Sequence, residues 1–437
     1  MNNISLKKSI LLLSLANLFF FFQFILRLSA GVFREDIMQR FAVDVASFGT
    51  LAGYYYLGYA GAQIPLGIML DRLSFRFVTS LAIAITSIGT LLFATAMDWG
   101  MLVFARFLIG IGSGVAFISI VKIIKTCFDP KHTSMLIGFS FTCGLLGAVF
   151  GVIPMRILFD NLGYEDTFYA LAIFGFFIAA IMFIFAKTGN EDRAGNEDEK
   201  NNSSVRDSLK SVMSLMLNPT ILIIGISGGL MVGALEGFAD VWALSFFHHV
   251  FAMSRAESAA VTSSVYIGMC VGGPLLAMFA NILRSTNLMI FITGMLTIIV
   301  FMILFYVPSL SVYSATILMF FLGILCCYQA LVFITTTKVV SESSAALAIA
   351  VVQCINMSFG HFFHSVIANI FVKSWDGMIG ESGGAIYTLE NYIYALAIIP
   401  IGCGVGQFGF VYLSWRAKKR GSESAVSSQL CNKMSRS

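Results

Sequence analysis

The chain has 437 residues, of which 58% are hydrophobic and only 11% are charged. A soluble globular protein carries about 25% charged residues, so this composition excludes an ordinary soluble domain and predicts that much of the surface faces lipid. The formal net charge is only +4, and no basic stripe with interleaved aromatic residues indicates a nucleic-acid partner. The eight cysteines follow no spacing typical of a disulfide framework or a zinc site.

Twelve apolar runs are each long enough to cross a bilayer as a helix, which takes about 20 residues. The first six cover residues 9–32, 46–70, 77–96, 101–123, 134–156 and 167–186. The second six cover residues 219–247, 259–280, 288–307, 312–335, 345–372 and 392–413. The pattern predicts an all-α integral membrane protein with twelve transmembrane helices in two sets of six.

A polar stretch separates the two sets, and its composition favours a solvated linker over a packed domain. The predicted organisation is an N-terminal six-helix bundle at 1–187 and a cytoplasmic linker at 188–218. A C-terminal six-helix bundle follows at 219–415, and a cytoplasmic tail at 416–437.

Lysine and arginine are concentrated in the loops on the same side as the N-terminus. Those loops carry Lys7, Lys8, Arg72, Arg76, Lys122, Lys125, Lys131, the five basic residues of 187–218, Arg284, Lys338, Arg416, Lys418, Lys419 and Arg420. The opposite loops carry Arg34, Arg40, Arg156, Arg255 and Lys373. Because cytoplasmic loops are rich in lysine and arginine, both termini are predicted to be cytoplasmic.

The loop after the second run reads Gly67-Ile-Met-Leu-Asp71-Arg72-Leu-Ser-Phe-Arg76. A glycine there permits close helix approach, and the charged residues can tie the inner faces of neighbouring helices. The segment resembles the signature loop of the major facilitator superfamily, although Ser74 stands where a glycine is common. The resemblance implies two six-helix bundles around a central cavity, and a gating role for Gly67, Asp71, Arg72 and Arg76.

The fourth run opens with Arg106 and continues with the spaced glycines Gly110, Gly112 and Gly114. This resembles a second motif of the same superfamily and implies a gating role for these four residues. The alternative is a small-residue packing face with an arginine that reaches toward the membrane surface. The segment 33–63 also resembles a bacterial branch of metabolite and amino-acid transporters, similar to phagosomal nutrient transporters.

Three charged residues lie deep inside predicted spans, where a charge costs a few kcal/mol and usually faces a cavity or a partner. Arg27 is in the first span, and Glu236 and Asp240 are in the seventh. Spacings of four place Gln23 with Arg27, and Glu236 with Asp240, on single helix faces. The superfamily resemblance implies that both spans line the cavity. Arg27 is then a ligand for a solute carboxylate, and the two acids hold an amino group or a proton; a structural Arg27–Asp240 ion pair is the alternative.

Further polar and aromatic residues inside the spans are candidates for solute or proton contact. These residues are Tyr55, Tyr59, Gln63, Gln329, Gln353, Asn356 and His361. Helix packing and interhelical hydrogen bonds explain each of them equally well. His361 and His364 lack a carboxylate or thiolate companion, so no metal site is predicted.

We therefore predict a proton-coupled symporter that takes up a small polar solute, such as an amino acid or small peptide, by alternating access. A transporter of an organic anion, vitamin or siderophore, in either direction, and a non-transporting membrane sensor are the alternatives. No HExxH, GxSxG or Walker-type motif indicates an enzyme, and no cofactor is expected. The expected protein is a monomer in the bacterial inner membrane, with a solute, H+ and the lipid bilayer as partners.

Overall fold

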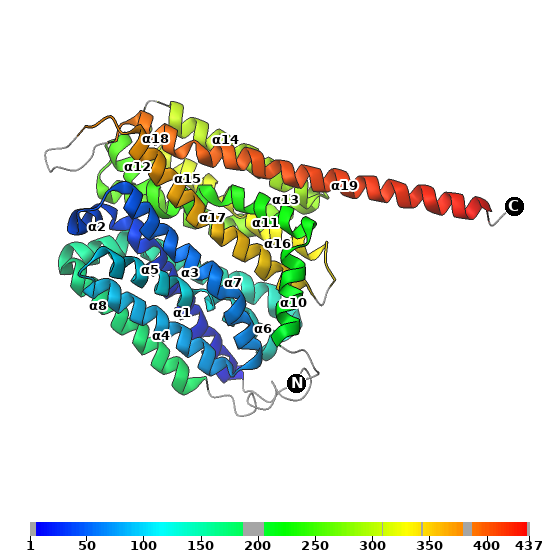
Figure 1. Ribbon diagram of the computed structural model, residues 1–437, viewed down its shortest axis with the longest axis horizontal. Helices are drawn as coiled ribbons and strands as arrows, with labels where there is room; N and C mark the ends of the chain where they lie inside the picture. The colour runs from blue at the N-terminus through cyan, green and yellow to red at the C-terminus, as the bar shows by residue number, and fades with distance from the viewer. Residues whose placement is uncertain (1–5, 187–204, 308, 342–343, 379–386, 435–437) are drawn as a thin grey trace.

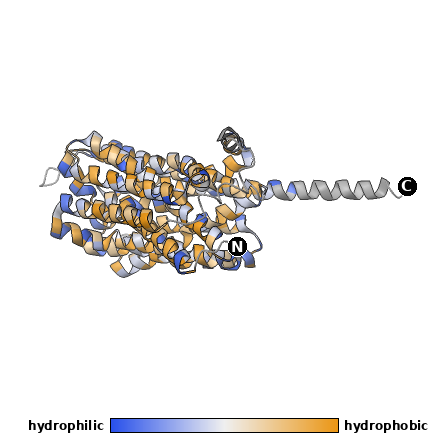
Figure 2. Cartoon of the chain, turned by 90° about the horizontal axis from the view of Figure 1, so that it is seen from below, coloured by the Kyte–Doolittle hydropathy of each residue, from blue (hydrophilic) through white to orange (hydrophobic). Residues whose placement is uncertain are grey.

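The computed structural model describes residues 6–186, 205–307, 309–341, 344–378 and 387–434. These residues form helices, turns and loops, and none of them lies in a β-strand. Side-by-side helices make an elongated bundle in which segments before residue 187 occupy one part and segments after residue 204 occupy the other (Figure 1). Hydrophobic residues make up most of the helices of the bundle (Figure 2), and many large ones are exposed on it, as expected for a lipid-facing surface.

The first part begins with α1 and ends with α8. Its helices are α1 (Leu6–Val32), α2 (Arg34–Phe41), α3 (Val45–Arg72), α4 (Phe75–Thr95), α5 (Trp99–Ser113), α6 (Ala116–Cys127), α7 (Thr133–Phe150) and α8 (Ile153–Phe185). Asp44, Ser74 and Asp98 each accept a hydrogen bond from a backbone N–H of the first turn of α3, α4 and α5. Such N-caps satisfy amide groups that a helix leaves free where it starts.

The second part begins with α10 and ends with α19. Its helices are α10 (Val205–Met216), α11 (Pro219–Met231), α12 (Ala243–Val250), α13 (Arg255–Ile282), α14 (Thr286–Tyr306), α15 (Val312–Cys326), α16 (Tyr328–Thr337), α17 (Ala345–Ser374), α18 (Leu389–Leu396) and α19 (Ile398–Met434). Between α11 and α12 the chain forms the 3₁₀ turn η2 (Val232–Ala234) and the π-helix η3 (Leu235–Trp242). A π-helix inside a span often marks a functional site, and η3 carries both acids of the seventh predicted span.

Ten helices of the described residues are long and apolar enough to cross a membrane. α3 has 28 residues but many tyrosines and glycines, which make it less apolar than the ten. The predicted fifth span is divided between α7 and the start of α8. α8 bends at Gly163, whose φ of 81° is readily available only to glycine, before it continues as the predicted sixth span.

Two predicted solvated segments contain helix. Residues 188–204 of the linker lie outside the described part of the chain, but α10 packs against α17 and buries Val212. α19 runs without interruption from the twelfth predicted span through the predicted tail to Met434. α1 begins at the end of the bundle where α10 lies, and α19 extends beyond that same end; α2, α12 and α18 lie at the opposite end, which we call the α2 end (Figure 1).

Within the described residues the two parts meet mainly along three helix pairs: α3 with α17, α7 with α13, and α1 with η3. A smaller contact joins α8 to α13. Glycines allow the closest of these approaches. A Cβ atom on Gly31 of α1 would collide with the Asp240 carbonyl, and one on Gly49 of α3 would collide with Ala368 of α17. Backbone contact of this kind brings the first and seventh predicted spans together in the middle of the protein.

Candidate solute site

A buried ion cluster joins α1 to η3 across the two parts. Arg27 of α1 donates through Nε to Asp240 Oδ2 at 2.7 Å, and its Nη2 lies 2.7 Å from the same oxygen. The same Nη2 lies 3.6 Å from Glu236 Oε1. Arg27 is 8% exposed, Glu236 is 1% exposed and Asp240 is 4% exposed. A buried ion pair is stable only where good geometry and further hydrogen bonds compensate for the hydration that both groups lose.

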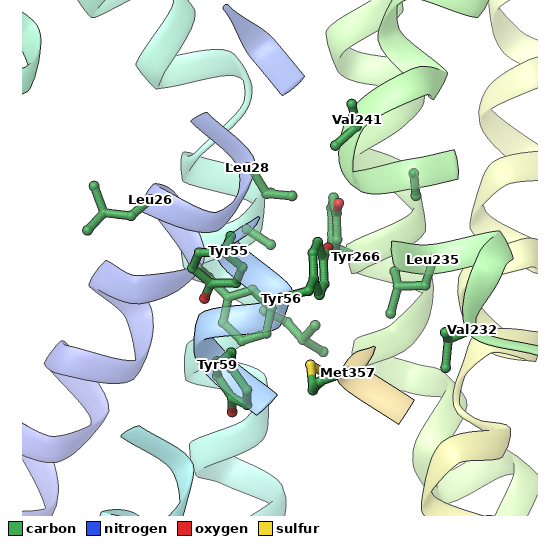
Figure 3. Packing of buried hydrophobic residues seen from close by; sticks show 14 of the residues in the cluster. Leu26, Leu28, Tyr55, Tyr56, Tyr59, Val232, Leu235, Val241, Tyr266 and Met357 are labelled. Carbon is green, nitrogen blue, oxygen red and sulfur yellow. The ribbon is translucent and has the colours of Figure 1, made fainter. Parts of the chain in front are cut away.

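Asp240 receives further donors from two tyrosines. The Tyr56 hydroxyl of α3 donates to Asp240 Oδ2, and the Tyr266 hydroxyl of α13 donates to Oδ1 at 2.7 Å. Tyr55, Tyr56 and Tyr59 of α3 gather opposite Tyr266 between the two parts (Figure 3). Asp240 is therefore held by one guanidinium and two hydroxyl groups.

Arg106 of α5 supports the arginine of the cluster from behind. It is 1% exposed and donates to the carbonyl oxygens of Leu26 and Arg27, each at 2.6 Å. Its guanidinium also lies 4.8 Å from the centre of the Tyr55 ring. Arg106 therefore does not reach toward the membrane surface. It binds the backbone of α1 at Arg27, the candidate ligand for the solute.

The other candidate solute-contact residues of the first part belong to α1 and α3. Gln23 accepts a hydrogen bond from the Tyr55 hydroxyl at 2.7 Å. The Tyr59 ring lies 6.2 Å from that of Tyr55, and both rings are buried. Gln63 is buried further along α3, and its Oε1 has no hydrogen-bond partner among the described residues.

The candidates of the second part are more dispersed. Gln329 of α16 lies near Glu236. Asn356 of α17 is fully buried against Gly228, and its side-chain amide has no hydrogen-bond partner within the described chain. His361 packs against Gly53 and the Tyr54 ring of α3. The structure thus places His361 at the α3–α17 contact.

Gln353 and His364 are the two other polar residues of α17 that the sequence singles out. Gln353 is half-buried, and its Oε1 has no partner in the described segments. His364 is fully buried against the Tyr56 ring, 5.2 Å between ring centres. In the part of the chain that the structure describes, no three or more His, Cys, Asp or Glu side chains come together in a way that could hold a metal ion.

The proposed gating glycines differ in how closely other atoms pack against them. Gly110 and Gly112 are required for packing, because a Cβ would collide with the Tyr55 carbonyl of α3 and the Ala82 carbonyl of α4. Gly114 lies under the Tyr59 carbonyl at 3.1 Å from an added Cβ. The prediction of a close helix approach at Gly67 is wrong for this arrangement, since an added Cβ would meet only the tip of Ile118, at 4.0 Å.

The charged residues of the first motif follow Gly67 in the sequence. Arg76 places its guanidinium 4.3 Å from the centre of the Phe183 ring of α8, within the first part. Arg72 is exposed, and the Asp71 side chain lies outside the described set. Lys122 of α6, which the sequence marked only as a membrane boundary, donates to the Leu70 carbonyl and ties α6 to the end of α3.

Sequence reasoning did not identify Tyr56 or Tyr266 as members of the site. Tyr56 is one of four tyrosines in a single span, where the spacing of four places Tyr55, Tyr59 and Gln63 on one helix face that does not include Tyr56. Tyr266 is the one tyrosine of the eighth predicted span. An isolated tyrosine in an apolar span is a usable signal, because a buried hydroxyl needs a partner.

The fold and this buried cluster define a multi-pass α-helical membrane protein whose two parts meet around polar groups. The family model described as Major Facilitator Superfamily matches residues 13–365. The chain belongs to the Major Facilitator Superfamily.

Several known proteins are similar to it. The nitrate/nitrite transporter NrtP of Picosynechococcus is 30% identical over 138 residues, which are 32% of this chain and 26% of that protein. Human vesicular glutamate transporter 2 is 30% identical over 138 residues, 31% of this chain and 24% of that protein. The uncharacterized transporter YybO of Bacillus subtilis is 22% identical over 270 residues, 58% and 61% of the two chains. The chain thus spans less than two thirds of each of these relatives.

Solved structures show the same fold. A bacterial homolog of the human lysosomal transporter Spinster, inward-facing and occupied, matches with a TM-score of 0.71 at 16% identity, covering 94% of this chain and 98% of that chain. The nucleoside transporter NupG matches with a TM-score of 0.69 at 19% identity, covering 92% and 99%.

Proposed function

We propose that the protein is a secondary active transporter that takes up a small polar solute together with a proton, by alternating access. The observation that carries this proposal is the buried cluster of Arg27, Asp240 and Glu236. It joins the two parts of the bundle at the position where a rocking motion would make and break contacts.

A solute with a carboxylate is the class that suits Arg27. A guanidinium offers paired donors that match two carboxylate oxygens, and in this arrangement Asp240 occupies that position. A solute carboxylate can replace Asp240 on Arg27 while Asp240 or Glu236 receives its amino group. An amino acid or small peptide fits this exchange, in line with the metabolite branch that the sequence resembles.

An organic anion is the second candidate. Two of the relatives are named for the transport of nitrate or nitrite and of glutamate, and a plant relative is named as a probable anion transporter. Arg27 alone suffices for such a solute, with Glu236 and Asp240 restricted to proton exchange. The two candidates differ in whether removal of the carboxylates abolishes solute binding.

The proposed orientation places both termini and α10 in the cytoplasm and the α2 end outside, in a bacterial inner membrane. The bias of lysine and arginine toward the α10 end supports this orientation. We also propose the division into bundles at 1–187 and 219–415, because helices on each side of the linker pack mainly with one another.

The test is uptake by proteoliposomes of radiolabelled amino acids, dipeptides and organic acids under an imposed proton gradient. Accumulation of one class, abolished by a protonophore, is the expected result. Arg27→Lys should lose most of this uptake because one ammonium cannot replace the paired guanidinium donors. Arg40→Lys is the matched control, since Arg40 pairs with Glu165 on the exposed surface.

Two results would contradict the proposal. If no solute of these classes accumulates while the protein is folded and inserted, proton-coupled uptake of such solutes is wrong. Unchanged uptake by Arg27→Lys would leave the transport proposal standing but would remove Arg27 as the carboxylate ligand.

A further inference from the structure

The two acids of η3 differ sharply in their hydrogen bonds, although they are one turn apart and equally buried. The oxygens of Asp240 receive Arg27 Nε, the Tyr56 hydroxyl and the Tyr266 hydroxyl. Glu236 has its nearest cation at 3.6 Å, and its Oε2 has no hydrogen-bond partner among the described residues. Besides that cation, Glu236 has the Gln329 amide near it. A buried carboxylate with few donors is disfavoured, whereas one with several donors is stable as an anion.

We infer that Tyr56 and Tyr266 are positioning residues that hold Asp240 as the ionised counter-ion of Arg27, which leaves Glu236 as the carboxyl that exchanges the coupled proton. The inference deepens the proposed function, because it assigns the proton of the proposed symport to one of two neighbouring acids.

The two tyrosines come from different parts of the bundle, and this has a mechanical consequence. Tyr266 and both acids belong to the second part, whereas Arg27 and Tyr56 belong to the first. If the parts separate at this level, Asp240 loses Arg27 and Tyr56 together and keeps only the Tyr266 hydroxyl. A solute ammonium group can then take the place of Arg27 on Asp240 while the solute carboxylate binds the released guanidinium.

The proton step at Glu236 is a simple exchange with water. In the closed arrangement the Glu236 O–H is intact. When the cavity opens, that O–H breaks and the proton passes to a water molecule on that side. The empty protein then returns to the other side with the Glu236 carboxylate beside Arg27, its nearest cation, and the carboxylate regains a proton there from hydronium. No oxidant, reductant or further reactant is needed.

Other groups surround the two acids and must be considered in any pH titration. The groups around Asp240 are Arg27 of α1, Tyr55 and Tyr56 of α3, Arg106 of α5 and Tyr266 of α13. His364 of α17 packs against the Tyr56 ring. The groups around Glu236 are Tyr59 of α3, Cys326 of α15 and Tyr328 of α16. Carboxyl groups can be observed separately from all of these, because a protonated carboxyl has its own carbonyl vibration in the infrared.

The experiment is an infrared pH titration of the reconstituted full-length protein, with the proton as the probe and no solute present. A protonated-carboxyl band that disappears as the pH rises is expected. It should be lost in Glu236→Gln and retained in Asp240→Asn. Labelling all aspartates with ¹³C should leave the band in place, which assigns it to a glutamate without any substitution and so remains decisive if a variant does not fold.

The tyrosines are tested in the same way. Tyr266→Phe removes the donor to Asp240 Oδ1, so the vibrations of the aspartate carboxylate, identified by ¹³C-aspartate labelling, should shift relative to those of the wild type. Tyr164→Phe is the matched control, because that buried hydroxyl donates to the Phe93 carbonyl, away from the cluster.

The inference is overturned if the wild-type band shifts with ¹³C-aspartate, if Glu236→Gln retains it, or if no carboxyl band titrates. It is also overturned if Tyr266→Phe leaves the vibrations of the aspartate carboxylate as they are in the wild type. Failure of the proposed function is separate: solute accumulation without proton dependence would refute symport even where the infrared assignment holds.

Discussion

Loss of the Glu35 carboxylate should make the α2 end open more often. Glu35 of α2 belongs to the first part, and its two oxygens lie 2.9 Å from His249 Nε2 and 2.9 Å from Arg255 Nη2. His249 and Arg255 belong to α12 and α13 of the second part. One carboxylate therefore bridges the two parts where the bundle is closed.

α2 is anchored to its own part by separate ion pairs. Arg156 of α8 lies 2.6 Å from Asp36, and Arg40 lies 2.7 Å from Glu165 of α8. α2 should therefore move together with α8, and the contacts of Glu35 should break when the parts separate.

The free energy that the Glu35 contacts contribute to closure can be estimated from the pKa of Glu35 and the exposure of its side chain. The hydrogen bond from His249, with the charges of Arg34 and Arg255 and against the effect of burial, lowers the pKa of Glu35 from 4.5 to about 2. Such a shift sets an upper limit of roughly 3 kcal/mol. Because the Glu35 side chain is 35% exposed, water screens both pairs, and about 1 kcal/mol is a realistic value. The open-to-closed ratio of Glu35→Gln should then rise about fivefold.

The two pKa values of Glu35 also determine in which direction the closed population changes with pH. The pKa of Glu35 is lowered in the closed arrangement, so its contribution is fully present above pH 4.5 and is lost as the pH falls toward 2. Titration of Glu35 should therefore leave the closed population unchanged between pH 7 and pH 5, lower it in part at pH 3, and approach the behaviour of Glu35→Gln only near pH 2.

The assay is the distribution of distances between spin labels at Asn161→Cys and Ala256→Cys. These exposed positions lie on α8 and α13, on opposite sides of the contact. The eight native cysteines must first be replaced. Glu165→Gln is the control, because it removes an exposed ion pair that stays within the first part. Equal distributions for wild type and Glu35→Gln, or an equal shift for Glu165→Gln, would refute the reasoning.

Two further substitutions test the packing around the site. Arg106→Gln leaves two buried carbonyls of α1 without their charged donors, so it should destabilise the protein by about 2–4 kcal/mol and lower its melting temperature; a melting curve like that of wild type would contradict the role of Arg106. Gly110→Ala places a methyl group against the Tyr55 carbonyl and should cost about 1–3 kcal/mol. Gly61→Ala on α3 meets nothing within 4 Å and should be neutral, so equal losses for the two alanines would exclude a steric cause.

Much of the fold follows from composition alone. Long apolar runs predict membrane helices because lipid requires every backbone amide and carbonyl to be bonded within the helix. The same pattern did not predict the π-helix η3 or the bend at Gly163. These features depend on how neighbouring helices pack against the span, and a hydropathy pattern holds no information about that packing.

Hydropathy along the chain shows that Arg27, Glu236 and Asp240 lie where a charge is costly, and therefore that they need partners. It does not show which partners they have, because Arg27 and Asp240 are 213 positions apart in the chain and Tyr56 and Asp240 are 184 apart. Helical periodicity states which residues share a face of one helix. The rotation of that face toward another helix is set by side-chain volumes over the whole interface, and it decided that Tyr56, one residue along from the predicted Tyr55, contacts the acid.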